Sequence, residues 1–530
     1  MPLLLLCAPR RAVGFRWLVL TAISALVGGG IARPARADDP LAAKIEEFLS
    51  QPHLAQAQVG LLFVDMETGD AIVERNSQRL FAPASVTKLF STAAALDALG
   101  AEHRFRTPVH YRGELKDGVL DGDLILVASG DLTLGGRTDE RGEIAFTDSD
   151  HTYANWSGEA TLTPQNPLAG LDDLARQVAA AGIKSIRGDV LIDDRLFDHA
   201  EGSGSGPSLV TPIVVNDNVI DFTLEPTEPG QPANVTWRPE TAWLEIESRV
   251  ETVREDVPLS TSVRLVEPGK LVVSGKIPAN RRPLVRIYEV PEPAAFARAL
   301  FIEALRRAGV KVAADLRDQS MVMLPAADAY ANLPKAAELV SPPFAESARL
   351  VLKVSHNLHA STLPLLVSAK HGQRTLADGM RLEGAFLSRA GVPVETISFG
   401  GGAGGARADF VTPAATVQLL RHMATRSDFA AYERALPILG VDGTLAKTLP
   451  ADSPARGKVQ AKTGTLVWDN LLAGRGLCTS KALAGYLTTA SGKRLAFAAF
   501  LNGVQLREGV DTKRLGSDLG KLCEMVHGGR

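Results

Sequence analysis

Cysteine is scarce in this chain of 530 residues, which contains three. Cys7 lies in the N-terminal segment, so Cys478 and Cys523 remain for the rest of the chain. No C-x-x-C pair occurs, and a redox motif or a zinc ribbon is therefore unsupported. An exported protein can oxidise two such cysteines to a disulfide, but the sequence does not fix the distance between them.

Long hydrophobic runs are absent after the N-terminus. The marked apolar stretch, Trp17–Ala32, has 16 residues, whereas a membrane-spanning helix needs about 20. Three arginines between positions 10 and 16 precede it, and Ala35-Arg36-Ala37 follows it. This order predicts a secretory signal peptide at residues 1–37, cleaved after Ala37, in preference to an uncleaved N-terminal anchor. We therefore expect an exported protein, periplasmic or extracellular, with no stable membrane anchor.

An excess of positive charge is also lacking. Residues 1–37 hold five of the 57 basic residues and no acidic ones, so 52 basic and 60 acidic residues remain, a formal charge of −8. Nucleic-acid binding requires a positive surface, and this balance argues against it.

The apolar pattern divides the chain after residue 37 into an outer part, 38–105 and 341–530, and an inner part, 106–340. The inner part is rich in short strands and turns, with a nested β module at about 223–285. No internal repeat or low-complexity tract occurs. The expected helices are 85–99, 171–182, 293–309, 351–370, 375–390, 412–425 and 511–527. The expected strands include two around a turn at 67–69, and 459–465, 477–488 and 494–502.

The first motif that carries chemistry is Ser85-Val86-Thr87-Lys88. Positions i and i+3 lie on one face of a helix, so Ser85 and Lys88 can meet at its N-terminus. A serine hydroxyl needs a nearby base, and a buried lysine can act as one when desolvation lowers its pKa to about 7–8. The alternative is a helix cap followed by a surface lysine, but the apolar neighbours favour a buried lysine.

The second motif is Ser355-His356-Asn357, at the head of a helix or on a loop between two helices. Ser355 can relay a proton between the nucleophile and the leaving nitrogen. Asn357 offers a donor and an acceptor for a peptide backbone. A polar helix cap is the alternative interpretation.

The third motif is Lys462-Thr463-Gly464-Thr465, on an expected strand. Lysine supplies a positive charge for a carboxylate, and the threonine hydroxyls supply hydrogen bonds beside it. Gly464 removes a side chain, so that a ligand can approach the strand backbone. A strand that ends in a turn is the alternative.

Together, S-x-x-K, S-x-N and K-T-G in this order are the signature of penicillin-recognising serine enzymes. Ser85 and Ser355 are 270 residues apart, a much longer gap than in class A β-lactamases. The chain resembles the D-alanyl-D-alanine carboxypeptidase/endopeptidase family, the class C low-molecular-mass penicillin-binding proteins. Further segments similar to this family are Gly130-Asp131-Leu132-Thr133-Leu134, Gly188–Asp198, Asn216-Asp217-Asn218 and Asp442-Gly443-Thr444-Leu445.

The resemblance implies an α+β fold with a penicillin-binding-protein/β-lactamase-like core, an antiparallel sheet flanked by helices, at 38–105 and 341–530. A large, mostly β insertion would occupy 106–340. It implies a serine D-Ala-D-Ala carboxypeptidase, with possible endopeptidase action, that acts on peptidoglycan stem peptides and is covalently inhibited by β-lactam antibiotics.

The resemblance also implies a role for each motif residue. Ser85 would be the nucleophile, Lys88 its base, Ser355 the proton relay and Asn357 a substrate ligand. Lys462, Thr463 and Thr465 would bind the terminal carboxylate, and the N–H groups of Ser85 and Thr465 would form the oxyanion hole.

One stretch departs from the family pattern. The family has a loop that reads D-G-S-G-L-S-R, and here Gly401-Gly402-Ala403-Gly404-Gly405-Ala406-Arg407 lacks the Asp and both Ser. That loop borders the active site in the family, so we expect the change to affect substrate preference or rate. A phosphate-binding loop is unsupported because no G-K-[ST] follows.

His356 stands where the family often has Asp, and we expect it to point away from the site. His356 and His359 are possible metal ligands by residue type, but no third ligand or H-E-x-x-H supports a metal, and no cofactor is expected.

Two other functions stay open. A β-lactamase or esterase lacks support because no E-x-x-L-N element of class A β-lactamases occurs, and a non-catalytic wall-binding protein would follow if the altered loop disabled the site.

Overall fold

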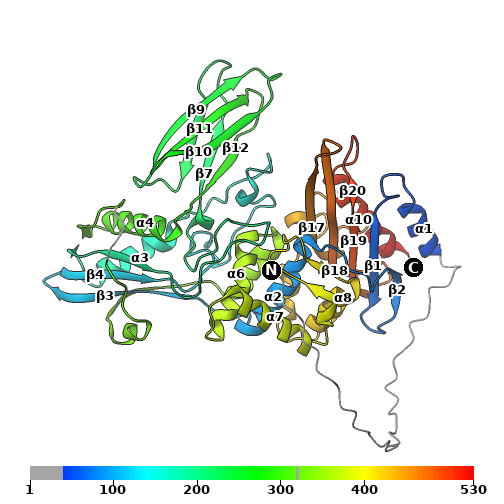
Figure 1. The fold of residues 1–530 in the computed structure, drawn as a ribbon, viewed down its shortest axis with the longest axis horizontal. Helices are drawn as coiled ribbons and strands as arrows, with labels where there is room; N and C mark the ends of the chain where they lie inside the picture. The colour runs from blue at the N-terminus through cyan, green and yellow to red at the C-terminus, as the bar shows by residue number, and fades with distance from the viewer. Residues whose placement is uncertain (1–39, 318–321, 530) are drawn as a thin grey trace, which may run out of the picture. The chain divides into compact units, whose positions relative to one another are not determined.

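The computed structural model describes residues 40–317 and 322–529. The predicted signal peptide at 1–37 lies outside these residues. Within the part of the chain that is described, no helix combines the length and the apolar character needed to cross a membrane. The described residues mix helices and strands, as the sequence predicts (Figure 1).

Both ends of the chain contribute to one antiparallel sheet. Its strand order is β17-β18-β19-β1-β2, and β20 pairs with β18. Strand β1 lies beside β19, from Gln58 opposite Asn502 to Asp65 opposite Leu495 (Figure 1). The strands are β1 (Gln58–Asp65), β2 (Ala71–Arg75), β17 (Val459–Asn470), β18 (Arg475–Thr488), β19 (Arg494–Asn502) and β20 (Val504–Gln505).

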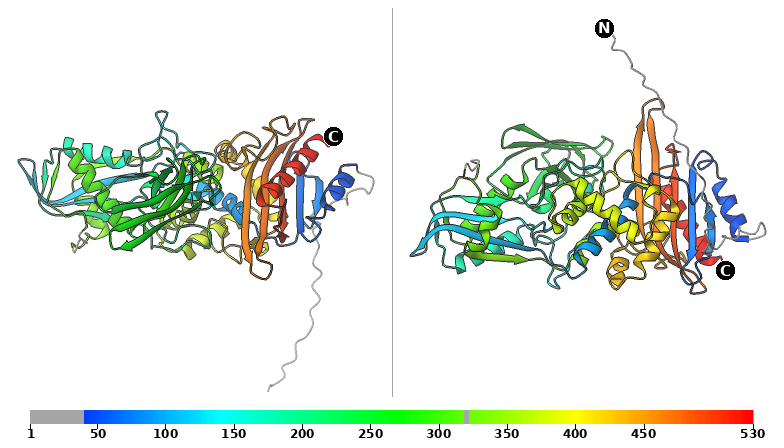
Figure 2. Two further views of the ribbon diagram at one scale, coloured as in Figure 1. Left: turned by 90° about the horizontal axis from the view of Figure 1, so that it is seen from above. Right: turned by 60° about the horizontal axis from the view of Figure 1, so that its bottom comes forward.

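Helices cover both faces of this sheet. Successive side chains of a strand point to opposite faces, and β1 has apolar side chains on both. In β1, Leu62 and Val64 pack on one side with helices α2, α5, α6, α7, α8 and α9. Leu61 and Phe63 pack on the other side with α1 and α10, and Figure 2 shows α10 lying along the sheet. The helices are α1 (Pro40–Leu49), α2 (Lys88–Leu99), α5 (Phe344–Lys353), α6 (Asn357–Lys370), α7 (Leu376–Arg389), α8 (Pro413–Met423), α9 (Phe429–Ala435) and α10 (Thr512–Gly528).

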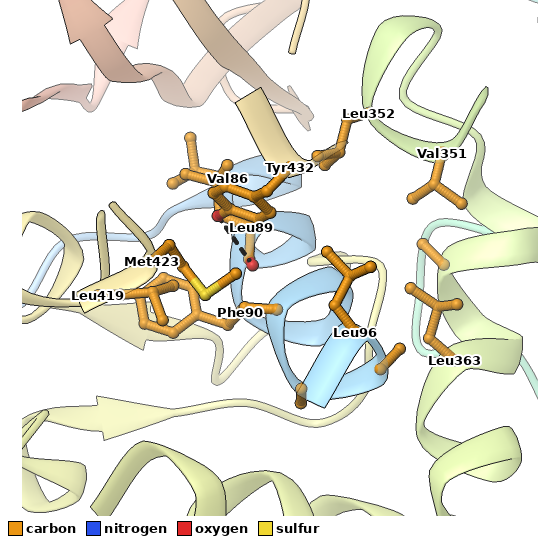
Figure 3. Packing of buried hydrophobic residues seen from close by; sticks show 14 of the residues in the cluster. Val86, Leu89, Phe90, Leu96, Val351, Leu352, Leu363, Leu419, Met423 and Tyr432 are labelled. Carbon is orange, nitrogen blue, oxygen red and sulfur yellow. Dashed lines mark hydrogen bonds between the residues drawn. The ribbon is translucent and has the colours of Figure 1, made fainter. Parts of the chain in front are cut away.

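Helix α2 is buried among the other helices, which explains why most of its residues are apolar or small. Leu89, Phe90 and Leu96 are fully buried, and the Tyr432 hydroxyl donates to the Leu89 carbonyl at 3.1 Å (Figure 3). The predicted helix 85–99 is confirmed, except that its first turn is a 3-10 turn, η1 (Ala84–Thr87). The helix ends before Gly100, whose φ is +89°, a conformation that suits glycine.

The single helix predicted at 351–370 is wrong. Helix α5 ends at Lys353 and α6 begins at Asn357, and Ser355 between them has φ of +63°. The apolar pattern continues through the break because the residues on both sides are buried, so periodicity alone does not reveal it. The predicted α7 and α8 are confirmed, and the side chains of Thr375 and Thr412 cap their N-termini.

Residues 106–340 form three further sheets and a second hydrophobic cluster. The largest sheet has the order β13-β5-β4-β3-β14 with β6 on β4, and helices α3 and α4 occur where the sequence predicts them. Two three-stranded sheets, β10-β11-β9 and β12-β7-β8, fall around the predicted β module. The division of the chain into two domains stays a prediction. The elements are β3 (Arg106–Lys116), β4 (Val119–Val127), α3 (Ala169–Ala180), β5 (Ser185–Ile186), β6 (Val190–Asp193), β7 (Val219–Glu225), β8 (Asn234–Arg238), β9 (Glu245–Val253), β10 (Ser260–Glu267), β11 (Lys270–Pro278), β12 (Leu284–Glu289), α4 (Pro293–Arg307), β13 (Lys311–Val312) and β14 (Lys335–Val340).

The two cysteines that follow the N-terminal segment do not form a disulfide in the structure. Cys478 and Cys523 are both free and buried in the cluster between the sheet and α10. Burial raises the pKa of the Cys478 thiol to about 11, so this thiol is unreactive at neutral pH.

Candidate active site

Ser85 borders two adjoining hollows of about 350 Å³ and about 1460 Å³. Tyr153, Trp156 and Thr465 line both of them together with Ser85. Ala84, directly before the serine, has φ of +47°, which a non-glycine residue adopts only where its surroundings hold it. The serine hydroxyl therefore stands at a fixed, accessible position at the start of the buried helix α2.

The Lys88 amine is fully buried and has three partners. Its Nζ lies 2.8 Å from the Ser85 Oγ, 2.8 Å from the Asn357 Oδ1 and 2.7 Å from the Ala403 carbonyl oxygen. Burial lowers the pKa of Lys88 to about 7, although the charge of Asp409 opposes this shift. A neutral amine keeps two N–H donors and one lone pair. It can donate to Asn357 and Ala403 and accept the proton of Ser85, as a general base requires.

The turn between α5 and α6 brings Ser355 and Asn357 to the same place. Ser355 lines the smaller hollow, and Asn357 lines the larger one and contacts Lys88. The Tyr153 hydroxyl donates to the Ser355 carbonyl. Tyr153 is a site residue that the sequence did not reveal, because it comes from the 106–340 segment.

Strand β17 closely approaches, at Gly464, the turn η1 (Ala84–Thr87) that carries Ser85. A Cβ at this position would lie 2.4 Å from the Pro83 carbonyl oxygen, so glycine is required for the contact. Thr463 and Thr465 line the smaller hollow with Ser85, and the Thr463 hydroxyl donates to the Thr444 hydroxyl at 2.8 Å. The structure thus brings the first and third motifs together.

Lys462 and Lys481 differ in the direction of their amines. Lys462 is buried, its Nζ donates to the Thr463 carbonyl at 2.7 Å, and it is not among the described residues that line either hollow. Burial, together with the charges of Lys88 and Lys481, holds the pKa of Lys462 well below its usual value. Lys481 lies opposite Thr465 in the β17–β18 pair, lines the smaller hollow and donates to the Thr465 hydroxyl at 2.9 Å. Lys481 was not predicted from the sequence, although a single lysine within an apolar strand is a signal that could have indicated it.

The glycine-rich loop at 400–407 packs against the turn that carries Ser85. It connects two short paired strands, β15 (Ile397–Ser398) and β16 (Phe410–Val411). A Cβ at Gly404, whose φ is +86°, would lie 2.0 Å from the Ala84 carbonyl oxygen. The Asp409 carboxylate closes the loop by accepting from the Gly400 N–H at 2.7 Å and from the Ala406 N–H at 2.8 Å. The altered loop is therefore built into the site, and its Ala403 carbonyl holds Lys88.

Arg407, which the family loop shares, lies over the Trp468 ring at 4.6 Å. Both residues line the larger hollow. A guanidinium at this distance from an aromatic face is attracted to the ring, so this contact fixes the outer end of the glycine-rich loop.

Asp217 supplies a third group beside His356 and His359, and by residue type these three could hold a metal. Hydrogen bonds engage one nitrogen of each ring, while the Nε2 of His356 and the Nδ1 of His359 have no hydrogen-bond partner in the described part of the chain. The two imidazole rings are stacked, with centroids 3.7 Å apart and planes 20° apart. A metal must lie in the plane of each ring, at about 2.0–2.1 Å from its nitrogen, and two nearly parallel planes do not meet at one ion.

With the fold and the geometry around Ser85 described, comparison with known families defines the class of this protein as a serine hydrolase. A model of the D-Ala-D-Ala carboxypeptidase 3 (S13) family matches residues 41–519. The chain therefore belongs to the D-Ala-D-Ala carboxypeptidase 3 (S13) family and is a serine-type D-Ala-D-Ala carboxypeptidase.

Individual relatives agree with this assignment. The chain is 29% identical over 491 residues to a D-alanyl-D-alanine carboxypeptidase of Actinomadura sp. (strain R39), which covers 87% of this chain and 80% of the relative. It is 24% identical over 473 residues to the D-alanyl-D-alanine carboxypeptidase DacB of Haemophilus influenzae, covering 84% of this chain and 86% of that one.

The fold is similar to that of a solved structure. The crystal structure of penicillin binding protein 4 (dacB) from Haemophilus influenzae matches with a TM-score of 0.69 and 22% identity, over 92% of this chain and 99% of that one. A second structure of that protein, complexed with a β-lactam, matches with a TM-score of 0.65 and 21% identity, over 92% and 98%. The predicted penicillin-binding-protein-like fold is confirmed.

Proposed function

We propose that Ser85 is the nucleophile and that Lys88 is its general base in cleaving the terminal D-Ala–D-Ala bond of peptidoglycan stem peptides. The Lys88 amine takes the proton of the Ser85 hydroxyl, and the Oγ attacks the carbonyl carbon of the penultimate D-Ala. The tetrahedral intermediate collapses to an ester on Ser85, and the terminal D-Ala leaves with a proton on its amine. The observation that carries this proposal is the buried Nζ of Lys88, 2.8 Å from the Ser85 Oγ.

The backbone N–H groups of Ser85 and Thr465 serve as the oxyanion hole. The close approach of Gly464 to Pro83 supports this assignment, since it sets β17 directly against the nucleophile turn. Removing one such donor typically lowers the rate by about 100- to 1000-fold.

The second and third motifs orient the peptide. Ser355 passes a proton towards the leaving amine. Asn357 has two roles: it accepts from Lys88 and it holds the peptide backbone. The terminal carboxylate binds to the hydroxyls of Thr463 and Thr465 and to the Lys481 amine, which lines the same hollow. Lys462 acts through its bond to the Thr463 carbonyl and thereby fixes the strand that carries both threonines.

A β-lactam imitates the D-Ala–D-Ala terminus, so the same serine is acylated by penicillin. The β-lactam complex of the Haemophilus influenzae protein agrees with this reactivity. The hollow of about 1460 Å³ beside Ser85 has room for a second stem peptide, which favours additional cleavage of cross-links. The substrate lies in the cell wall, which fits an exported protein with its signal peptide removed after Ala37.

Incubation of residues 38–530 with a pentapeptide that ends in D-Ala-D-Ala tests the proposal. Mass spectrometry should show the release of one D-Ala by the unmodified chain and none by a Ser85→Ala variant. A slow acyl-enzyme without peptide turnover would instead indicate a non-catalytic wall-binding protein, and rapid turnover of antibiotic would indicate a β-lactamase.

A further inference from the structure

The turn that carries Ser355 and Asn357 is strained. Ser355 adopts φ of +63°, in the left-handed region that disfavours every residue with a Cβ. Such a conformation persists only where neighbouring groups hold it. The groups that hold this turn therefore determine where the second motif meets Lys88 and the substrate.

The first of these groups is the side chain between the two motif residues. His356 is completely buried and turned away from the hollows, as the sequence analysis expects. Its Nδ1 accepts the backbone N–H of His359 at 3.3 Å, which caps helix α6 at its first turn. The ring of His356 stacks on that of His359, so the two side chains form one unit.

The second group is Asp217, which comes from the 106–340 segment. Its Oδ1 lies 2.7 Å from the Nε2 of His359 and 3.2 Å from the Nε2 of His356. Its Oδ2 accepts from the Arg137 guanidinium at 2.7 Å and from the His151 Nε2 at 2.8 Å. One carboxylate thus joins the second motif to the interior of the inserted segment.

The buried cluster is balanced in charge without a metal ion. Both ring nitrogens of His151 face carboxylates, so this ring carries two protons and a positive charge. Although burial alone would lower it, Asp221 and Asp150 raise the pKa of His151 to about 10. Three cations therefore offset three carboxylates in the surroundings of the stacked pair. The carboxylates are Asp150, Asp217 and Asp221, and the cations are Arg137, Arg238 and His151.

We propose that Asp217, His356 and His359 are positioning residues for acyl transfer, and that through them the inserted segment forms part of the catalytic machinery. They hold the strained turn so that Asn357 meets Lys88 and Ser355 faces the leaving group. Tyr153 supports the same turn by donating to the Ser355 carbonyl. This inference rests on the proposed acyl transfer at Ser85.

A double-mutant cycle between Asp217→Asn and His359→Gln tests the inference. The rate of acylation at saturating benzylpenicillin is measured well below the thermal midpoint of each variant. Each single variant should acylate at least about tenfold more slowly, and the double variant should be no slower than the worse single one, because interacting residues are non-additive. For His359→Gln the concentration of penicillin at half-maximal rate should change less than about twofold, since His359 lines neither hollow beside Ser85.

A matched control is His199→Gln, because His199 forms a histidine–aspartate pair with Asp194 at the surface, 2.7 Å apart. Its acylation rate should stay within about twofold of the unmodified rate. Tyr153→Phe provides a second variant if His359→Gln does not fold. It removes one hydrogen bond to Ser355 and should lower the acylation rate by about three- to tenfold.

Folded variants of Asp217 and His359 with unchanged acylation rates would overturn the inference. So would one equivalent of zinc in the purified protein, measured by elemental analysis and lost in His359→Gln. Absence of acylation in the unmodified protein would overturn the proposed function and the inference with it. This outcome differs from failure of the inference alone, in which the unmodified protein and the variants acylate at the same rate.

Discussion

The Lys88 amine donates to the side-chain oxygen of Asn357 at 2.8 Å, across 269 residues of sequence. This bond joins the helix of the first motif to the turn that carries the second motif. The Ala403 carbonyl accepts the second hydrogen of the neutral Lys88 amine. The two bonds together fix the direction of the lone pair. The acid–base chemistry of the site follows from this arrangement.

Acylation should accelerate as pH rises through about 7. Burial lowers the pKa of Lys88 to about 7, and the amine accepts the Ser85 proton only in its neutral form. Below that pH the ammonium has no lone pair, so the rate should fall about tenfold per pH unit. Stopped-flow acylation between about pH 5.5 and 8.5 checks this, and a flat profile would exclude Lys88 as the base.

Gly404→Ala should damage the site more than an equally strained substitution elsewhere. The new Cβ would lie 2.0 Å from the Ala84 carbonyl oxygen, whereas Gly372 has φ of +71° and nothing within 4 Å. Both variants pay about 1–2 kcal/mol for the left-handed backbone, but Gly404→Ala must also displace the nucleophile turn. We expect an acylation rate at least about 100-fold lower for Gly404→Ala and a nearly unchanged rate for Gly372→Ala. Equal rates in the two variants would contradict the packing of this loop on the turn.

Lys481→Met should weaken binding of the substrate carboxylate. Lys481 lines the hollow beside Thr465, and loss of a charge-assisted hydrogen bond of about 1.5–3 kcal/mol predicts a roughly 10- to 100-fold lower kcat/KM. For a peptide whose C-terminal carboxylate is replaced by an amide, the same substitution should lower kcat/KM only slightly. If both peptides are affected equally, Lys481 does not bind the carboxylate. Lys493→Met, which removes an exposed lysine paired with Asp65, is the control.

Glu383→Gln should stabilise the protein more at about pH 8 than at about pH 5. Glu383 is buried in α7 and, in the described part of the chain, neither carboxyl oxygen has a hydrogen-bond partner. Burial, with a contribution from Asp409, raises the pKa of this carboxyl to about 8. The unfolded chain releases the proton near the ordinary value and the folded chain retains it, so the fold loses stability as pH rises between the two. Thermal unfolding at the two pH values checks this, and an equal shift in midpoint at both would show that Glu383 does not titrate in this way.

The sequence predicted the features that depend on local spacing. The Ser85–Lys88 pair follows from i and i+3 positions on one helical face, and the helix ends at Gly100 because glycine adopts the required φ. The order of the three motifs also came from the sequence, and the family resemblance that followed added the core built from both parts of the chain.

The remaining features depend on contacts between distant segments, which one sequence does not specify. The break at Ser355 lies between two buried helices and leaves the apolar pattern intact. The K-T-G motif pointed to Lys462, whereas the structure places Lys481 opposite Thr465 and beside the smaller hollow. Asp217 approaches His359 from 142 residues away, so the sequence offered no third partner for the two histidines.

Intact-protein mass spectrometry after brief exposure to benzylpenicillin tests the central claim most directly. The account predicts one covalent penicilloyl adduct, located by peptide mapping on Ser85 and absent from Ser85→Ala. An adduct of the same stoichiometry in Ser85→Ala, or on any other residue, would contradict it.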